Sequence, residues 1–61
     1  MEASVNYSVT AETAVPGDTR YQPDRIWVWG RGKSDARDKA LRRWMEWGYK
    51  VAIGTVQVCK G

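Results

Sequence analysis

The chain has few side chains suited to catalysis. It contains no histidine, so the commonest general base and the commonest metal ligand at neutral pH are both absent. Its single cysteine, Cys59, has no partner for an internal disulfide, which fits a reducing compartment. Asp35 and Asp38 have basic neighbours and stand where a helix is expected to begin, so structural roles explain them. We therefore expect no enzymatic activity, no catalytic residue, no metal ion and no cofactor.

The segment Gly-Arg-Gly-Lys-Ser, residues 30–34, has a composition suited to binding an anion. The full phosphate-loop motif needs a glycine five residues before Gly32, where this chain has Trp27. We therefore exclude nucleotide hydrolysis but retain a site for one phosphate or carboxylate at the helix N-terminus. The candidate residues are Arg31, Lys33, Ser34 and Arg37. The alternative is a tight glycine turn with solvated cations.

Tryptophan is abundant, with four residues in 61. We expect Trp44 and Trp47 to face the sheet, one of Trp27 and Trp29 to meet them, and the other to lie on an uncovered face. Exposed aromatic side chains near arginines are typical of protein-binding hot spots and of platforms for single-stranded nucleic acid. The candidate partner-binding residues are Trp27, Trp29, Arg25, Tyr49 and Lys50. Shielding by the segment 12–24 is the alternative.

A strand and a helix must position these groups. Residues 25–30 include four consecutive β-branched or aromatic residues, which is typical of a strand that is apolar on both faces and central in its sheet. Residues 34–47 have apolar side chains at helical spacing, with Ser34 as the expected N-cap. Gly48 suits the left-handed residue that ends many helices.

Two further strands are expected. Residues 3–11 alternate between apolar and polar side chains, as in a strand with one buried face. Residues 12–24 are expected to form a long hairpin connection with a type II turn at Pro16-Gly17, and the ends of this connection can extend the flanking strands. In residues 49–60 the apolar positions change parity at Gly54, which predicts one strand with a bulge near 54. A turn that separates two very short strands is the alternative.

These elements predict one small α+β domain over residues 1–61. Its order is ββαβ, with a three-stranded antiparallel sheet and one helix packed on one face. Either of the first two strands can be central. Seven acidic residues against ten basic ones give a net charge of +3, which allows an acidic partner. We expect no membrane segment and a cytoplasmic location.

The segment from Gly30 to residue 44 resembles, locally, the C-terminal part of double-stranded-RNA-binding domains. There, Gly-x-Gly-x-Ser leads into a helix that carries Ala-Lys-x-x-Ala. The matching residues are Gly30, Gly32, Ser34, Ala36, Arg37 and Ala40. The family's Lys-Lys pair is replaced by Asp35, and no helix is expected before the strands, so most of the family's phosphate contacts are not implied here.

In size and character the chain also resembles small proteins of phages and mobile elements, including anti-CRISPR inhibitors. That resemblance implies a non-enzymatic binder that docks on a nucleic-acid-handling protein or ribonucleoprotein complex. The second hypothesis is a small regulator that binds RNA or DNA directly. A homodimer formed through open faces or edge strands is compatible with both.

Overall fold

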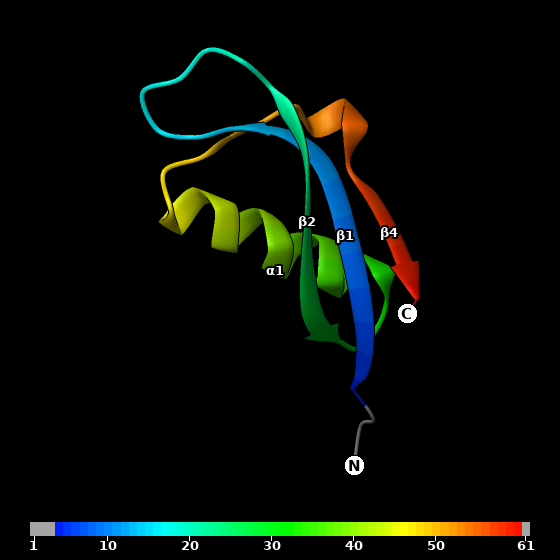
Figure 1. Ribbon diagram of the computed structural model, residues 1–61. Coiled ribbons are helices and arrows are strands. Elements are labelled where there is room, and N and C mark those ends of the chain that lie inside the picture. The colour runs from blue at the N-terminus through cyan, green and yellow to red at the C-terminus, as the bar shows by residue number, and fades with distance from the viewer. Residues whose placement is uncertain (1–3, 61) are drawn as a thin grey trace.

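The computed structural model describes residues 4–60, which form one helix and four strands (Figure 1). The elements along the chain are β1 (Val5–Ala14), β2 (Gln22–Gly30), α1 (Lys33–Glu46), β3 (Lys50–Val51), the short 3-10 helix η1 (Ile53–Thr55) and β4 (Gln57–Lys60). Helix α1 crosses one face of the sheet, and within residues 4–60 no helix covers the other face. The expected α+β architecture with one helix on an antiparallel sheet is confirmed.

Strand β1 is the centre of the sheet. It pairs antiparallel with β2 along one side and with β3 and β4 along the other. Within the described chain β2 pairs with β1 alone, so β2 is an edge strand. Of the two strand orders that the sequence leaves open, the structure has the one with the first strand in the middle, so residues 25–30 are not central although their composition is typical of a central strand. Their apolar run reflects a helix-facing side together with exposed tryptophans on the other side, which the sequence pattern does not separate from burial on both sides.

The C-terminal segment is divided, so the sheet has four strands instead of three. In place of a bulged strand over 49–60, η1 separates β3 from β4, as in the alternative interpretation of the change in parity. Thr55 closes this turn, because its hydroxyl donates to the Ala52 carbonyl at 2.6 Å and accepts the Glu12 N–H at 2.8 Å. Val51, Val56 and Val58 pack against the core, whereas Ile53 lies in η1 and is exposed.

The ends of residues 12–24 extend the two flanking strands, as the sequence pattern allowed. β1 continues to Ala14 and β2 begins at Gln22, which leaves residues 15–21 as the connection. Gly17 has φ +84° and the Asp18 N–H donates to the Val15 carbonyl at 3.0 Å, the geometry of the expected type II turn. Pro23 is accommodated within β2 because this strand is at the edge, where a missing N–H is tolerated.

Helix α1 begins one residue earlier than expected and without a Ser34 cap. The N-cap residue is Gly32, which has no side chain to accept a hydrogen bond. The Asp35 carboxylate instead accepts the Arg31 N–H at 3.0 Å, and so satisfies a backbone donor just before the helix. At the other end Gly48 has φ +78°, and the N–H groups of Gly48 and Tyr49 donate to the carbonyls of Met45 and Trp44. This is a Schellman motif, in agreement with the expected role of Gly48.

The core lies between α1 and the helix-facing side of β1 and β2. Its buried members are Tyr7, Val9, Ala11, Val28, Ala36, Ala40 and Trp44. The two alanines let the helix approach the sheet closely, and Trp44 fills the wider space beyond them. Trp47 was expected to face the sheet but is 47% exposed at the C-cap, where its ring contacts Tyr49.

Trp44 is the largest fully buried side chain in the described residues, and its indole N–H has a hydrogen-bond partner on the sheet. The Asp24 carboxylate on β2 accepts this N–H at 3.1 Å. The same carboxylate oxygen accepts the Thr13 hydroxyl at 3.5 Å, and the second oxygen accepts the Arg25 N–H at 2.8 Å. Asp24 therefore joins the helix, β1 and β2 through one side chain.

Replacing Asp24 with alanine is expected to lower the free energy of unfolding by about 1–3 kcal/mol, because a buried indole donor loses its acceptor. Urea unfolding of Asp24→Ala, Trp44→Phe and the double variant would measure the coupling between the two residues. Asp38→Ala, an exposed acidic residue on α1, is the control. If Asp24→Ala lowers the free energy of unfolding equally in the wild-type protein and in the Trp44→Phe variant, the proposed role of Asp24 as the acceptor for Trp44 is contradicted.

Gly30 is expected to be intolerant of alanine, because a Cβ there would lie 3.0 Å from the Ala36 backbone nitrogen and 3.2 Å from its Cα. We expect Gly30→Ala to lower the free energy of unfolding by about 1–3 kcal/mol, as overpacking does. Gly54→Ala is the matched control, since a Cβ at Gly54 meets nothing within 4 Å. Similar stabilities of the two variants would show that the helix moves away from Gly30 without cost.

Candidate functional site

Trp27 and Trp29 lie on the same side of β2, the side that α1 does not cover. The register pairs Tyr7 with Val28, and both side chains are buried beneath the helix. Side chains alternate along a strand, so Trp27, opposite Ser8, and Trp29, opposite Asn6, must face the other way. The expectation that one of the two tryptophans meets the helix is wrong, because residues two positions apart share a face.

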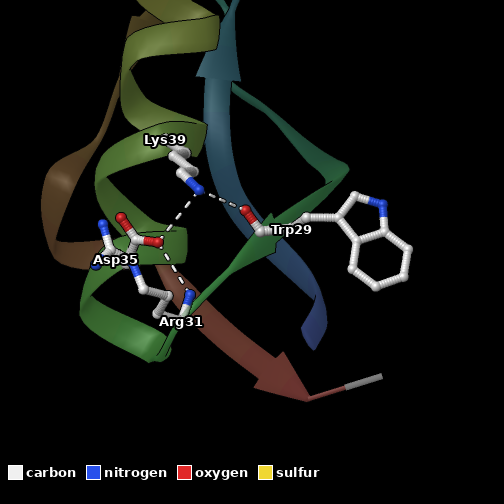
Figure 2. A network of polar contacts seen from close by, with 4 residues as sticks. All are labelled: Trp29, Arg31, Asp35 and Lys39. Atoms are coloured by element: carbon white, nitrogen blue, oxygen red, sulfur yellow. Dashed lines mark hydrogen bonds and ion pairs between the residues drawn. The ribbon is translucent and has the colours of Figure 1, made fainter. Parts of the chain in front are cut away.

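Both indoles are accessible, with Trp27 53% and Trp29 60% exposed. Figure 2 shows the Trp29 ring directed away from α1. The hairpin connection, which was considered as a shield, lies at the opposite end of β2 from Trp29. The Cα atoms of the two residues are about 6.8 Å apart along the strand. Two large aromatic side chains thus stand next to each other on an uncovered sheet.

We call this surface the open face. It comprises Asn6, Ser8, Thr10 and Glu12 of β1, Arg25, Trp27 and Trp29 of β2, and Gln57 and Cys59 of β4, as the register places them. Ser8 is the centre of one cross-strand row, with Trp27 on one side and Cys59 on the other. It is 8% exposed although no helix covers it, because these two neighbours enclose it. The face is therefore aromatic along β2 and small and polar along β1.

The open face is hollowed beyond the tryptophans. A cavity of about 720 Å³ lies there, lined by Thr10, Ala11, Glu12, Pro23, Asp24, Arg25, Gly54, Thr55 and Gln57. Arg25 contributes the single positive charge of this lining, whereas Glu12 and Asp24 contribute two negative charges. Arg25 is two residues from Trp27 on the same strand, and the predicted grouping of Arg25, Trp27 and Trp29 agrees with this arrangement.

Tyr49 and Lys50 do not lie with the tryptophans. Tyr49 packs against the core on the helix side, in contact with Trp47. Lys50 pairs with Ala14, eight residues along β1 from the partner of Trp29, a separation of about 27 Å. The structure therefore divides the five predicted partner-binding residues into one compact group of three and two distant residues.

The candidate anion-binding residues gather where β2 turns into α1. There the carboxylate of Asp35, in the first turn of α1, lies against the turn (Figure 2). This carboxylate accepts the Arg31 N–H and forms an ion pair with Lys39 at 3.2 Å. Lys39 also donates to the Trp29 carbonyl at 2.8 Å. Ser34 and Lys33 are exposed in the first helical turn, and Arg37 is half-buried.

The Asp35 carboxyl group is electrostatically favoured in its ionised form. The hydrogen bond from the Arg31 backbone N–H, followed by that from the Lys39 ammonium, holds the pKa of Asp35 below its ordinary value of 3.8. A carboxylate that remains charged at the helix N-terminus opposes the approach of a second anion. This arrangement favours a structural role for the turn.

Several residues of the open face were not singled out from the sequence. Cys59 and Gln57 become part of it because β4 pairs with β1 in a register that the change of parity at Gly54 concealed. The alternation of residues 3–11 predicts a polar face that contains Asn6, Ser8 and Thr10. Asp24 carried no distinct signal, since its acceptor role depends on where Trp44 packs.

Within residues 4–60, no group of three or more potential metal-binding side chains comes together. Helix α1 lacks the length and the apolar character that crossing a bilayer requires. No family model matches the chain, and comparisons with curated proteins and with solved structures found no match.

The ionisation of Asp35 is expected to make the free energy of unfolding depend on pH in the acidic range. Its pKa is lower in the folded state than in the unfolded chain, so its contribution is present at neutral pH and is lost as pH falls below about 3.8. Asp35→Asn should be less stable than wild type at about pH 7, and the difference should shrink towards pH 2. Urea unfolding across this range measures it, with Asp38→Asn as the control. A difference that is constant with pH would exclude the carboxylate as its origin.

Proposed function

We propose that this chain is a non-enzymatic binding protein and that its docking surface is the open face, centred on Trp27 and Trp29. The observation that carries this proposal is the exposure of two neighbouring indoles on a sheet face without a covering helix. Water-exposed aromatic surface of this size is unfavourable, and it is typical of surfaces that a partner buries.

The composition of the open face favours a protein as the partner. Tryptophan and arginine are the residue types most enriched at protein-binding hot spots, and Trp27, Trp29 and Arg25 lie together here. The surrounding side chains of β1 are mostly uncharged, as in the centre of a protein interface. The single positive charge of Arg25 lies with the two negative charges of Glu12 and Asp24, which provides little attraction for a phosphate backbone.

The partner class that we propose is a nucleic-acid-handling protein or ribonucleoprotein complex, with this chain acting as an inhibitor of the phage type. The small size, the basic charge of +3 and the scarcity of catalytic side chains support that role. Small inhibitors of this kind act by occupying a surface that the target needs, which requires a stable scaffold and one exposed hot spot.

Direct binding of single-stranded nucleic acid is the second candidate. Aromatic side chains on an uncovered sheet are suited to base stacking, and Lys39, Arg42 and Arg43 lie beside the same strand. A titration with single-stranded RNA and DNA, followed by tryptophan emission, separates the candidates. Saturable quenching that weakens steeply with salt supports nucleic acid, whereas no quenching leaves the protein partner.

Cys59 provides a direct test of the protein-binding proposal, because this exposed thiol lies in the same cross-strand row as Trp27. A photo-crosslinker attached to Cys59 is expected to capture a specific protein from host lysate. The Trp27→Ala/Trp29→Ala variant should lose at least about 90% of this product, since hot-spot truncation costs 2 kcal/mol or more.

Met45→Ala is the matched control, because Met45 is 72% exposed but lies on α1. Circular dichroism should show that all variants remain folded, since the substituted side chains are exposed. Capture that survives the double tryptophan substitution, or that is equally strong from a crosslinker placed at Asp38→Cys in a Cys59→Ser background, would refute the assignment of the open face.

A further inference from the structure

A groove runs between the outer edge of β2 and the polar side of α1, separate from the hollow on the open face. Its volume is about 550 Å³, and its lining consists of Trp27, Val28, Trp29, Lys39, Arg42, Arg43 and Glu46. The floor is the backbone of an edge strand and the wall is a row of charged helical side chains. An edge strand carries outward N–H and C=O groups that another extended chain can pair with.

Two hydrogen bonds show which backbone groups of β2 point outward. The Arg25 N–H donates to the side chain of Asp24, and the Trp29 carbonyl accepts the Lys39 ammonium. Neither group is therefore directed at β1. In an antiparallel pair, a residue directs its N–H and C=O to the same side, and alternate residues share that side. The N–H and C=O of Trp27, midway between them, consequently point into the groove.

Side-chain hydrogen bonds at Arg25 and at Trp29 limit the length of another chain that can pair with the outer edge of β2. Asp24 covers the donor at Arg25 and Lys39 covers the acceptor at Trp29, so the accessible length is centred on Trp27. Side-chain capping of this kind protects an edge against unlimited pairing. It leaves room for a short extended segment of a few residues.

The charge of the groove selects its occupant. Lys39 is balanced by Asp35, which leaves the exposed Arg42 and Arg43 against Glu46. A second copy of this chain, paired edge to edge about a twofold axis, would bring these arginines towards their own copies. The repulsion between these like charges opposes such pairing. An acidic segment of a different protein meets no such repulsion.

We propose that β2 accepts an extended acidic segment of a partner protein by strand addition, with the residue opposite Trp27 apolar and its two neighbours acidic. Directly opposed residues share a face, so a side chain opposite Trp27 lies on the open face and contacts the indoles. The neighbouring side chains point to the helix side, where Arg42 and Arg43 lie. This inference rests on the proposed function and specifies the partner segment that would extend the open-face interface.

The probe is a capped heptapeptide with glutamate at odd positions and valine at even positions. We expect saturable binding to the wild-type protein, together with slowed hydrogen exchange of the Trp27 N–H. A peptide of the same composition with its glutamates in one block should bind at least about tenfold more weakly, as should a peptide N-methylated at its central valine. Equal affinity of all three peptides would overturn strand addition.

The matched variants separate this inference from the proposed function. Arg42→Gln/Arg43→Gln should weaken peptide binding at least about tenfold, while Arg20→Gln, which changes an exposed arginine of the hairpin connection outside the groove, should not. Absence of peptide binding at millimolar concentration, with Trp27-dependent crosslinking from Cys59 intact, would refute strand addition and leave the open face as the docking surface. Loss of that crosslinking dependence would instead refute the proposed function.

Sedimentation of the free protein tests the choice of occupant. A monomeric mass is expected, and peptide binding should leave the number of protein copies unchanged. A doubled mass, with slow exchange at the Trp27 N–H in the absence of peptide, would identify a second copy as the occupant of the edge and overturn the proposal.

Discussion

The hydrogen bond between the Trp44 indole and the Asp24 carboxylate is the interaction on which the arrangement of this small domain depends. A chain of this size buries only about 60% of the surface that it exposes when unfolded. Complete burial of one tryptophan contributes roughly 4–6 kcal/mol of transfer free energy, a large share for such a domain. That gain requires an acceptor for the indole N–H, and Asp24 supplies it from β2. The position of the helix over the sheet is thereby tied to one pair of side chains.

At its N-terminal end, α1 lies close to β2, and this close packing complements the hydrogen bond between Trp44 and Asp24. Gly30, Ala36 and Ala40 have little or no side chain, so α1 lies almost against β2 where the helix begins and is separated from the sheet by Trp44 where it ends. With the helix-facing side of β2 committed to Ile26 and Val28, the alternation of the strand directs Trp27 and Trp29 outward. The exposed aromatic pair is thus a geometric consequence of how the core is filled.

The chemistry at the β2–α1 turn has a corresponding structural basis. Gly32 supplies no capping side chain, and Asp35 compensates by accepting the Arg31 N–H and pairing with Lys39, which in turn covers the Trp29 carbonyl. These contacts combine a backbone N–H of the turn with Asp35 and Lys39, two helix residues that the sequence did not assign to anion binding. They also protect one end of the β2 edge, so the uncovered backbone and the exposed indoles meet around Trp27. The open face, the outer edge of β2 and the groove between that edge and α1 are therefore parts of one continuous surface.

The sequence by itself determined the class of the fold, the hairpin turn at Pro16-Gly17, the helix and its end at Gly48, because these depend on local periodicity and on backbone conformations that particular residues favour. It also identified Arg25, Trp27 and Trp29 as binding candidates from their types and proximity. Only the tertiary structure decided that β1 is central, that residues 49–60 divide around η1 and that Asp24 serves Trp44. It likewise placed Cys59 beside Ser8 and separated Tyr49 and Lys50 from the tryptophans. The physical reason is that strand order, register and the partner of a buried donor arise from contacts between residues far apart in the chain, which no local pattern specifies.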